Sequence, residues 1–283
     1  VQHTGGLGGA PRSLAFLISR LDRSKYEPIV LCLWGGPAVE LLEKAGAKVI
    51  VDKKIKPFHG TTVSGMNLEM FIKGVIHAYP SYIRAKKLIK EINPDLVHLN
   101  TTCLFMIAKA AKKVINNVKV VTHVREPLLD SLAGKILRYM NHKYVDAYIA
   151  IDNYDGSKID KRGRIFKVVY NFVDLKEYNC NNSSNILREE LNIDKDDMIL
   201  LYLARIAKTN GTIEMVEAFS KRFKDDKKKH LVVVGDVPED KSDYATKVRE
   251  VIEATDNIHL VGFRNDIPNV IASSDVMIAP FVE

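Results

Sequence analysis

Short apolar runs alternate with amphipathic stretches through the first 172 residues of the chain. The runs are five to six residues long and rich in Val and Ile, which is typical of strands buried on both faces. The stretches between them carry apolar residues at helical spacing. This alternation predicts βαβ units around a parallel, doubly wound sheet. The expected strands are residues 29–34, 47–51, 95–99, 119–124, 147–151 and 166–171, and the expected helices are residues 11–21, 38–45, 81–92, 105–116 and 132–143.

The pattern stops at residues 173–197, a polar, Asn- and Ser-rich segment that we expect to be a linker. It resumes at residue 198, so two Rossmann-like α/β domains are predicted, residues 1–172 and 198–283, facing each other across a cleft. The chain opens inside a glycine-rich loop without a preceding strand, and the second domain lacks closing elements. We therefore expect a part of a longer protein. The further expected strands are residues 198–205, 230–236, 258–261 and 276–279, and the further helices 212–223, 243–254 and 267–272.

Charge is unevenly distributed between the two halves. The 42 Lys and Arg against 35 Asp and Glu give a net charge of +7, but residues 1–172 hold 27 basic and 14 acidic side chains, while residues 173–283 hold 15 and 21. A basic half suggests an anionic partner, which is nucleic acid, a membrane surface or a phosphorylated substrate. We expect no nucleic acid, because the aromatic residues are not arranged as a stacking platform.

A segment of the basic half narrows the choice of partner. Apolar and aromatic residues are dense over residues 58–82, and the basic sequence RAKKLIK follows at residues 84–90. A helix of this composition suits an anionic membrane surface or a groove for a lipid-linked acceptor. Packing of the same residues in the core, with the lysines solvated, is the alternative.

Composition excludes several other classes of protein. No apolar run approaches the ~20 residues that span a bilayer, and no signal peptide opens the chain. The three cysteines, Cys32, Cys103 and Cys180, are too scattered for a disulfide framework, so we expect a cytoplasmic protein. The eight histidines lack metal-ligand spacing, and no metal site is expected.

The opening loop, GGLGGAPRSL at residues 5–14, is a candidate phosphate site. Glycines let the backbone approach a phosphate, and the helix that follows offers free N–H groups at its positive end. A dinucleotide site is disfavoured, because the third glycine of GxGxxG is replaced by Pro11 and the strand that ends at Trp34 lacks the acidic residue that binds ribose. A tight strand-to-helix turn without a ligand is the alternative.

The sequence VTHVREP places His123, Arg125 and Glu126 at the carboxyl end of an expected strand. Ligands bind at this edge in open α/β sheets, so the three residues are candidate site residues. A packed core histidine and a structural Arg125–Glu126 ion pair remain the alternatives. His98 occupies a similar position and is a weaker candidate.

Three further motifs follow along the chain. YNFVD at residues 170–174 ends the first half, LARIAKTNG at residues 203–211 opens the second domain, and residues 259–283 read HLVGFRNDIPNVIASSDVMIAPFVE. With the glycine loop and H-x-R-E, their order resembles the retaining glycosyltransferases of family 4, whose catalytic domains have the GT-B fold. The resemblance spans nearly the whole chain. It departs from the family pattern at Phe172, Ala204 and Asn210, which stand where glycine, glycine and lysine are usual.

The resemblance implies roles for individual residues. Arg205 and the backbone N–H groups of the glycine loop would stabilise the leaving diphosphate, with Lys208 replacing the usual lysine. His123 and Glu283 would hold the donor sugar, and the loop that contains Phe263 would meet the nucleotide base. A second family glutamate lies eight positions beyond Glu283, so we expect the donor site to be incomplete here. The implied donor-binding residues are Gly8, Gly9, Asn171, Arg205, Lys208, Asn210, Gly235, Phe263, Arg264 and Glu283; the implied catalytic residues are His123, Arg205 and Glu283; and the acceptor-side residues are Arg125 and Glu126.

The implied function is a retaining transfer of sugar from a nucleotide-diphosphate sugar to a saccharide or lipid-linked acceptor. Such enzymes generally need neither a cofactor nor a metal. The family and the charge together suggest cell-surface polysaccharide or glycolipid synthesis at the inner face of the membrane. A non-hydrolysing nucleotide-sugar epimerase and a non-catalytic protein that binds sugar nucleotides or carbohydrate are the alternatives.

Overall fold

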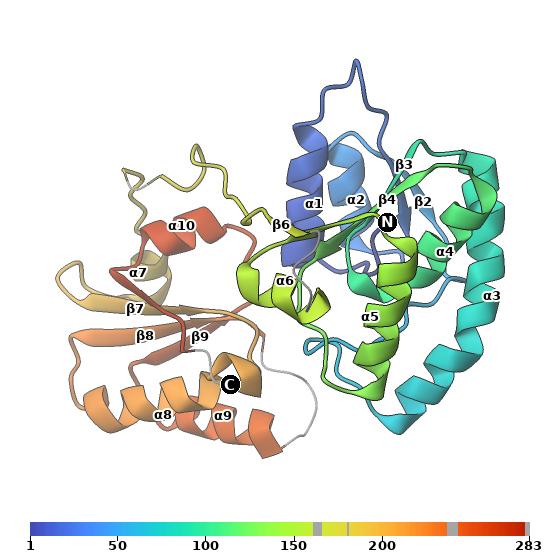
Figure 1. Cartoon of the computed structure of the whole chain (residues 1–283). Helices are drawn as coiled ribbons and strands as arrows, with labels where there is room; N and C mark the ends of the chain where they lie inside the picture. Colours follow the sequence, from blue (N-terminus) through green and yellow to red (C-terminus); the bar gives the residue numbers. More distant parts are fainter. Residues whose placement is uncertain (161–165, 180, 237–242, 281–283) are drawn as a thin grey trace. The chain divides into compact units, whose positions relative to one another are not determined.

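The computed structural model describes the 283-residue chain except for residues 161–165, 180, 237–242 and 281–283 (Figure 1). The chain divides into two compact units, Val1–Phe172 and Val173–Glu283, which are described separately. Each unit is an α/β structure with a parallel sheet. The predicted fold class is therefore confirmed for both.

The first unit is built on parallel strands in the order β3-β4-β5-β6, with β1 and β2 as a separate parallel pair. The first two residues connect these sheets, because Gln2 N donates to Leu31 O at 2.9 Å and Asn100 N donates to Val1 O at 3.0 Å. The carboxyl ends of all these strands therefore lie along one edge. The strands are β1 (Ile29–Cys32), β2 (Lys48–Val51), β3 (Leu96–Leu99), β4 (Lys119–Val124), β5 (Ala147–Ala150) and β6 (Phe166–Val168).

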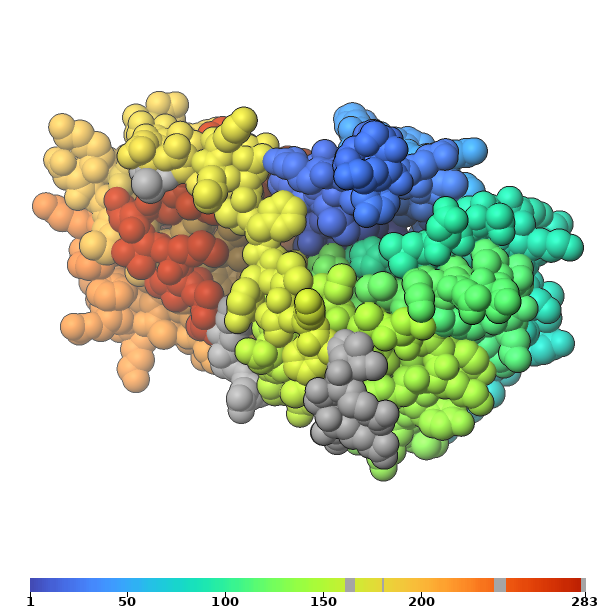
Figure 2. Space-filling model, turned by 45° about the horizontal axis from the view of Figure 1, so that its top comes forward, coloured from blue at the N-terminus to red at the C-terminus, as the bar shows by residue number. Residues whose placement is uncertain are grey.

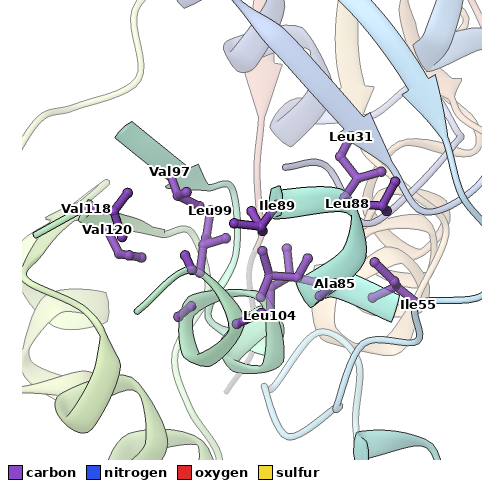
Figure 3. Packing of buried hydrophobic residues seen from close by; sticks show 14 of the residues in the cluster. Leu31, Ile55, Ala85, Leu88, Ile89, Val97, Leu99, Leu104, Val118 and Val120 are labelled. Atoms are coloured by element: carbon purple, nitrogen blue, oxygen red, sulfur yellow. The ribbon is translucent and has the colours of Figure 1, made fainter. Parts of the chain in front are cut away.

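A hydrophobic core lies between the first unit's sheet and its helices (Figure 3). Ala85, Leu88 and Ile89 pack from one helix against Leu99 and Val120 of the sheet. Removing such side chains from water is the main favourable term in folding. The helices are α1 (Gly9–Ser19), α2 (Pro37–Lys44), α3 (Leu68–Ile92), α4 (Phe105–Val114), α5 (Leu132–Tyr144) and α6 (Asn153–Ile159), with a 3₁₀ turn η1 (Thr102–Leu104).

The third helix differs from its prediction. Helix α3 was expected to begin at residue 81, but it begins at Leu68 and continues through Pro80. Proline usually ends or kinks a helix, which is why the sequence pattern placed the start after it. The side chain of Asn67 caps the observed start by accepting from Met70 N at 2.8 Å. The dense apolar residues of this segment are therefore helical along most of their length.

The second unit contains a four-stranded parallel sheet in the order β10-β7-β8-β9. Helix α10 lies at the surface of this unit, in red in Figure 2. The strands are β7 (Met198–Leu203), β8 (Lys229–Val234), β9 (Ile258–Gly262) and β10 (Val276–Ile278), and the helices are α7 (Ile186–Leu191), α8 (Thr212–Phe223), α9 (Asp243–Glu253) and α10 (Ile267–Ala272), with a 3₁₀ turn η2 (Lys208–Asn210).

Part of the expected linker is folded, so its predicted range of 173–197 was too long. Helix α7 lies inside it, and Leu187 and Ile193 are buried in a cluster with Val232 and Val270. A six-residue helix with one fully buried side chain carries too short an apolar period to be recognised from sequence.

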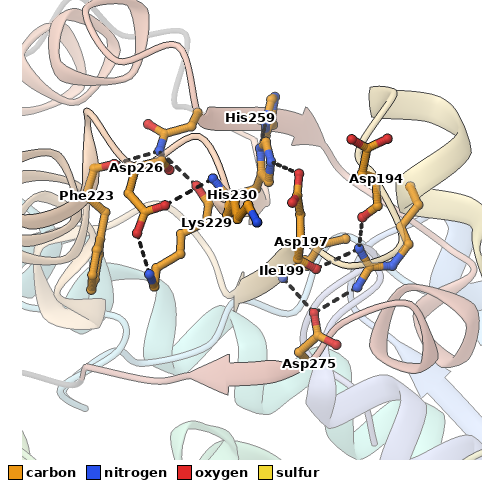
Figure 4. A network of polar contacts seen from close by, with 12 residues as sticks. Asp194, Asp197, Ile199, Phe223, Asp226, Lys229, His230, His259 and Asp275 are labelled. Carbon is orange, nitrogen blue, oxygen red and sulfur yellow. Dashed lines mark hydrogen bonds and ion pairs between the residues drawn. The ribbon is translucent and has the colours of Figure 1, made fainter.

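The amino-end edge of the second sheet is held by a polar network (Figure 4). Asp275 accepts hydrogen bonds from Ile199 N at 2.7 Å and from Arg188 Nη2 at 2.9 Å. His230 lies between Asp197 and His259, with nitrogen contacts of 3.3 Å and 3.0 Å. The aspartate of the SDV motif therefore joins β10, β7 and α7, a structural task on the edge opposite the carboxyl ends of the strands.

Candidate donor site and strand-end cluster

A pocket of about 470 Å³ lies at the carboxyl ends of β7, β8 and β9 in the second unit. It brings together four of the residues implicated in donor binding: Arg205, Gly235, Phe263 and Arg264. Ligands in open α/β sheets bind at this edge. The remaining lining residues are Leu203, Ala204, Ile206, Ala207, Val234, Asp236 and Ile267.

Close backbone approach fixes two glycines of this unit, Gly235 in the pocket lining and Gly211 in the loop after β7. Gly235 has φ of +150°, and a Cβ atom there would lie 2.2 Å from the carbonyl oxygen of Ala204. Gly211 has φ of +65°, and its Cβ would lie 1.8 Å from Pro280 O. Only glycine permits both the conformation and the contact. The loops that follow β7 and β8 are thereby fixed against their neighbours.

The departure from the family pattern at Asn210 has a structural explanation. The Asn210 side-chain amide donates to Arg205 O at 2.7 Å, and the Tyr202 hydroxyl donates to Asn210 O at 3.1 Å. Asn210 thus closes the loop that carries Arg205. Lys208, on η2 within this loop, is exposed.

The two arginines of the pocket have different surroundings. The Arg205 side chain is exposed and has no ion-pair partner among the described residues. Arg264 donates to Glu190 at 2.6 Å and to Asp266 at 2.7 Å. Hydrogen bonds to these two carboxylates raise the pKa of Arg264. Arg205 is therefore available to an anionic ligand, whereas Arg264 holds α7, the loop after β9 and the start of α10 together.

The loop after β9 is also fixed from the other side. Phe263 N donates to the Asp236 carboxylate at 3.0 Å, and Gly235 N donates to Gly262 O at 2.9 Å. About half of the Phe263 side chain is exposed, at 53%. The pocket therefore combines an unpaired cation, a fixed glycine turn and an exposed aromatic ring, a set that can hold a phosphate and a planar base.

In the first unit, Arg125 is the centre of a polar cluster at the ends of β3 and β4. It donates through Nε to Asn100 Oδ1 at 2.8 Å, and through Nη1 to Ser13 Oγ at 3.1 Å and Asn171 Oδ1 at 3.2 Å. Its Nη2 lies 3.3 Å from His123 Nδ1. All four partners are neutral side chains, and burial lowers the pKa of Arg125 to about 10. The guanidinium joins the glycine-loop helix, two strand ends and the YNFVD turn.

The state of His123 follows from this contact. His123 is 8% exposed, and its pKa is lowered to about 4, first by burial and then by the charge of Arg125. The neutral ring must accept at Nδ1, since Arg125 only donates, so the proton is on Nε2. Among the described residues His123 Nε2 has no hydrogen-bond partner. This nitrogen is also buried, so the ring carries an unsatisfied donor near the end of β4.

Other predicted residues have separate positions. Glu126 accepts from Thr61 Oγ1 at 2.6 Å, so Arg125 and Glu126 bind different partners and the alternative of an ion pair is not observed. His98 packs 5.7 Å from His123, ring centre to ring centre, and burial lowers its pKa to about 3.

The glycine loop ends in an open helix start. Gly8 is the N-cap of α1 and provides no side-chain cap, and a Cβ at Gly8 or Gly9 would meet no atom within 4 Å. The first N–H groups of α1 therefore remain accessible to an anion. Glu283, predicted to hold the donor sugar, lies outside the described residues.

Sequence reasoning missed some members of both sites. Asn100 and Ser13 bind Arg125, although Asn100 stands in no recognised motif and Ser13 was not singled out within the glycine-loop sequence. Asp236 was recognised only as the end of a strand, yet its carboxylate orients the loop after β9. Asn100 carried one available signal, since it follows an expected strand end directly. Within the described residues, no group of three or more His, Cys, Asp or Glu is arranged to hold a metal ion.

Comparison with known proteins places this geometry in a family. Residues 7–177 match the model of Glycosyltransferase Family 4, and residues 183–282 match that of Glycosyl transferases group 1. The chain is 22% identical over 245 residues to N-acetyl-alpha-D-glucosaminyl L-malate synthase of Bacillus anthracis, covering 78% of this chain and 58% of that protein. The chain thus spans less than two thirds of that relative's length.

Solved structures share the fold. HepE of Anabaena, in complex with UDP and glucose, superposes with a TM-score of 0.76 at 20% identity, over 99% of this chain and 73% of that one. A glycosyltransferase from Rickettsia africae superposes with a TM-score of 0.73 at 21% identity, over 100% and 72%. With family models matching both units, the chain belongs to glycosyltransferase family 4 and has the GT-B fold.

Proposed function

We propose that the protein is a retaining glycosyltransferase that takes its sugar from a nucleotide-diphosphate donor. The observation that carries this proposal is the pocket of the second unit, where Arg205 has no carboxylate partner among the described residues and Phe263 is exposed. Support also comes from HepE of Anabaena, which was solved with UDP-glucose.

The proposed chemistry uses the protein's own positive groups. Arg205 and the N-terminal N–H groups of α1 are proposed to stabilise the negative charge of the leaving diphosphate. A donor that meets this charge in a site from which the bound substrates exclude water contributes several kcal/mol. The acceptor hydroxyl forms its bond to the sugar's anomeric carbon on the face from which the diphosphate departs, and the diphosphate oxygen takes the hydroxyl proton. His123 donates from Nε2 to a hydroxyl of the donor sugar. We propose that no metal is needed, because these groups supply the positive charge.

Donor binding tests the proposal. UDP-, GDP- and ADP-glucose are each added to the protein and its thermal unfolding is followed. One of them is expected to raise Tm, and Arg205→Ala is expected to reduce that shift while the control Arg222→Ala, on the far end of α8, retains it. No shift with any donor contradicts the proposal. Acceptor-dependent release of nucleoside diphosphate separates a transferase from an epimerase, which needs no acceptor, and from a protein that only binds.

We also propose that the first unit works at the anionic inner face of a membrane in cell-surface polysaccharide or glycolipid synthesis. No helix in the described parts of the chain is long and apolar enough to cross a bilayer. Helix α3, however, exposes an apolar stripe opposite its buried face, with Ile76 63% and Tyr79 70% exposed. Lysines flank the stripe, and each adds about 1 kcal/mol near an anionic surface. The stripe consists of Leu68, Ile72, Val75, Ile76, Tyr79 and Ile83.

Flotation with liposomes tests this docking. The protein is expected to float with vesicles that contain anionic lipid and to remain behind with neutral ones. Ile76→Asp is expected to abolish flotation, while Leu132→Asp, an equally exposed leucine on α5, preserves it. Flotation that is unchanged by Ile76→Asp would contradict docking through α3.

A further inference from the structure

A second pocket, of about 740 Å³, lies in the first unit between three segments. One wall is the start of the glycine loop, from His3 to Gly5, and another is the segment after β2. The first half of α3 completes it. The lining residues are His3, Thr4, Gly5, Trp34, Lys56, Pro57, His59, Met70, Lys73, Gly74 and His77.

Close packing at glycines fixes two walls of the pocket. A Cβ at Gly5 would lie 2.2 Å from Gly35 O, and Ala38 N donates to Gly5 O at 2.9 Å. The glycine loop is therefore tied to the turn after β1, which places Trp34 beside it. On the opposite wall, a Cβ at Gly74 would meet the Phe58 ring at 3.0 Å. Helix α3 thus lies directly against the segment that carries Lys56.

The chemistry of the lining is cationic. Two lysines and three histidines face the pocket, and none of the described lining residues is acidic. The Lys56 ammonium has no carboxylate partner in the described part of the chain and lies 4.2 Å from the centre of the Trp34 ring. A cation over an aromatic face remains able to bind an anion with its other donors.

Two carboxylates lie near the pocket without lining it. Glu69 pairs with Lys73 at 2.5 Å, but both side chains are largely exposed, so the pair is weakly held. Glu126 acts on His59 electrostatically, yet burial dominates and the pKa of His59 is lowered. Burial also lowers the pKa of His3 to about 4. At neutral pH these two histidines are therefore uncharged hydrogen-bonding groups, and the lysines supply the charge.

We propose that this pocket receives the acceptor and that the acceptor carries an anionic group, a carboxylate or a phosphate, bound by Lys56 and Lys73 beside Trp34. The identification as an acceptor rests on the proposed glycosyl transfer; the anion site itself rests on the pocket. A ligand in this position lies against the start of the glycine loop, whose far end is the open N-terminus of α1. Binding of an anionic acceptor would account for part of the excess positive charge in the first unit.

Trp34 makes the proposal directly testable, because it is the single tryptophan of the chain and lines the pocket. Its fluorescence is followed during titration with inorganic phosphate or succinate, at constant ionic strength and without nucleotide. We expect a saturable change with at least one anion. The phosphate and succinate titrations decide between a phosphate-bearing and a carboxylate-bearing acceptor, and glucose serves as the neutral probe.

Variants of the lining lysines test whether the change in Trp34 fluorescence comes from binding in the pocket. Lys56→Ala is expected to weaken anion binding about tenfold, the effect of one charge-assisted hydrogen bond of ~1.4 kcal/mol, and Lys56→Arg to restore it. Lys73→Ala weakens it less. The matched control is Lys44→Ala, which removes an exposed lysine that pairs with Glu40 at the same i,i+4 spacing and leaves binding unchanged.

Three outcomes overturn the proposal: no saturable change with either anion, an unchanged affinity in Lys56→Ala, or glucose binding as tightly as the anions. Failure of the transferase proposal is a separate result. Donor binding is measured by nucleoside diphosphate titration, which does not depend on Trp34, so each proposal can fail while the other stands.

Discussion

Each unit has an arginine at the carboxyl ends of its strands, and the two arginines differ in the charge of their hydrogen-bond partners. Arg264 in the second unit binds two carboxylates, and its pKa is raised. Arg125 in the first unit binds only neutral groups, and burial lowers its pKa. A neutralised arginine serves mainly to hold loops together, whereas an arginine without a counter-charge favours the approach of an anion. We therefore propose that Arg264 mainly holds loops together and that Arg125 lies at the reaction site.

Replacing Arg125 gives the largest expected effect. Arg125→Ala removes the donor that fixes the His123 tautomer and the link between α1 and the strand ends. Misplacement by about 1 Å costs roughly 10²-fold in rate, so kcat/KM for transfer is expected to fall about 10²-fold. Arg125→Lys restores little, because lysine lacks the fork that reaches four partners. A rate within threefold of wild type in Arg125→Ala would contradict the assignment.

Gly235→Ala tests the close backbone approach at Gly235, which lines the second unit's pocket. The new Cβ would collide with Ala204 O at a φ of +150°, at a cost of about 1–3 kcal/mol. We expect a lower urea midpoint for the second unit and weaker donor binding. The control for stability is Gly8→Ala in the first unit, whose Cβ enters open space. Equal stability of the two variants would show that the close approach is absent in solution.

Acidification is expected to destabilise the first unit through its buried histidines. Burial lowers the pKa of His3 and His123 to about 4 and that of His98 to about 3. The unfolded chain takes up these protons near pH 6.5, so their contribution to stability is full above 6.5 and declines as the pH falls toward 4. Burial also lowers the pKa of His59, which acts in the same direction. Asp155, whose pKa is raised to about 6, opposes the trend with one group against four.

Trp34 fluorescence during urea unfolding reports the first unit alone, since the second contains no tryptophan. We expect the urea concentration at the unfolding midpoint to decrease as the pH is lowered from 6.5 to 4.5. In His98→Gln this decrease is expected to be smaller. A midpoint that is constant over this range contradicts the assigned neutral state of these histidines.

Arg264→Ala gives the smallest effect. Its partners Glu190 and Asp266 are partly exposed, so the loss in stability is about 1 kcal/mol or less and shrinks as salt is added. The arginine lowers the pKa of Asp266, so this contribution is present at neutral pH and disappears as acid protonates the carboxylate. A loss of donor binding with unchanged stability would instead make Arg264 a ligand-binding residue.

Much of the fold could be predicted because strands and helices produce local patterns of apolar and polar residues. Strand β4 and helices α8 and α10 were predicted with their observed limits. Helix α3 was shortened in prediction by Pro80, whose local penalty is outweighed by packing along 25 residues. Contacts between residues far apart in the sequence could not be predicted. Glu190 lies 74 positions before Arg264, and no local pattern connects the two.

The sequence predicted that several implied donor-binding residues lie together better than it predicted the role of each. Arg205, Gly235, Phe263 and Arg264 do line one pocket. Their motif positions could not show that Arg264 is neutralised, because charge compensation depends on three-dimensional contacts. The hydrogen bond from the Asn210 side chain to Arg205 O could not be predicted from the sequence either. Glu283 stays a prediction, as do the roles of Lys208 and the glycine-loop N–H groups.

Calorimetric titration with a nucleoside diphosphate tests the central claim most directly. The wild type, Arg205→Ala and Lys56→Ala are each titrated with UDP, GDP and ADP. Saturable binding of one diphosphate is predicted in the wild type, about tenfold weaker in Arg205→Ala, where one charge-assisted contact is lost, and unchanged in Lys56→Ala. Absence of binding to all three, or equal affinity in the wild type and Arg205→Ala, would contradict a donor site at Arg205.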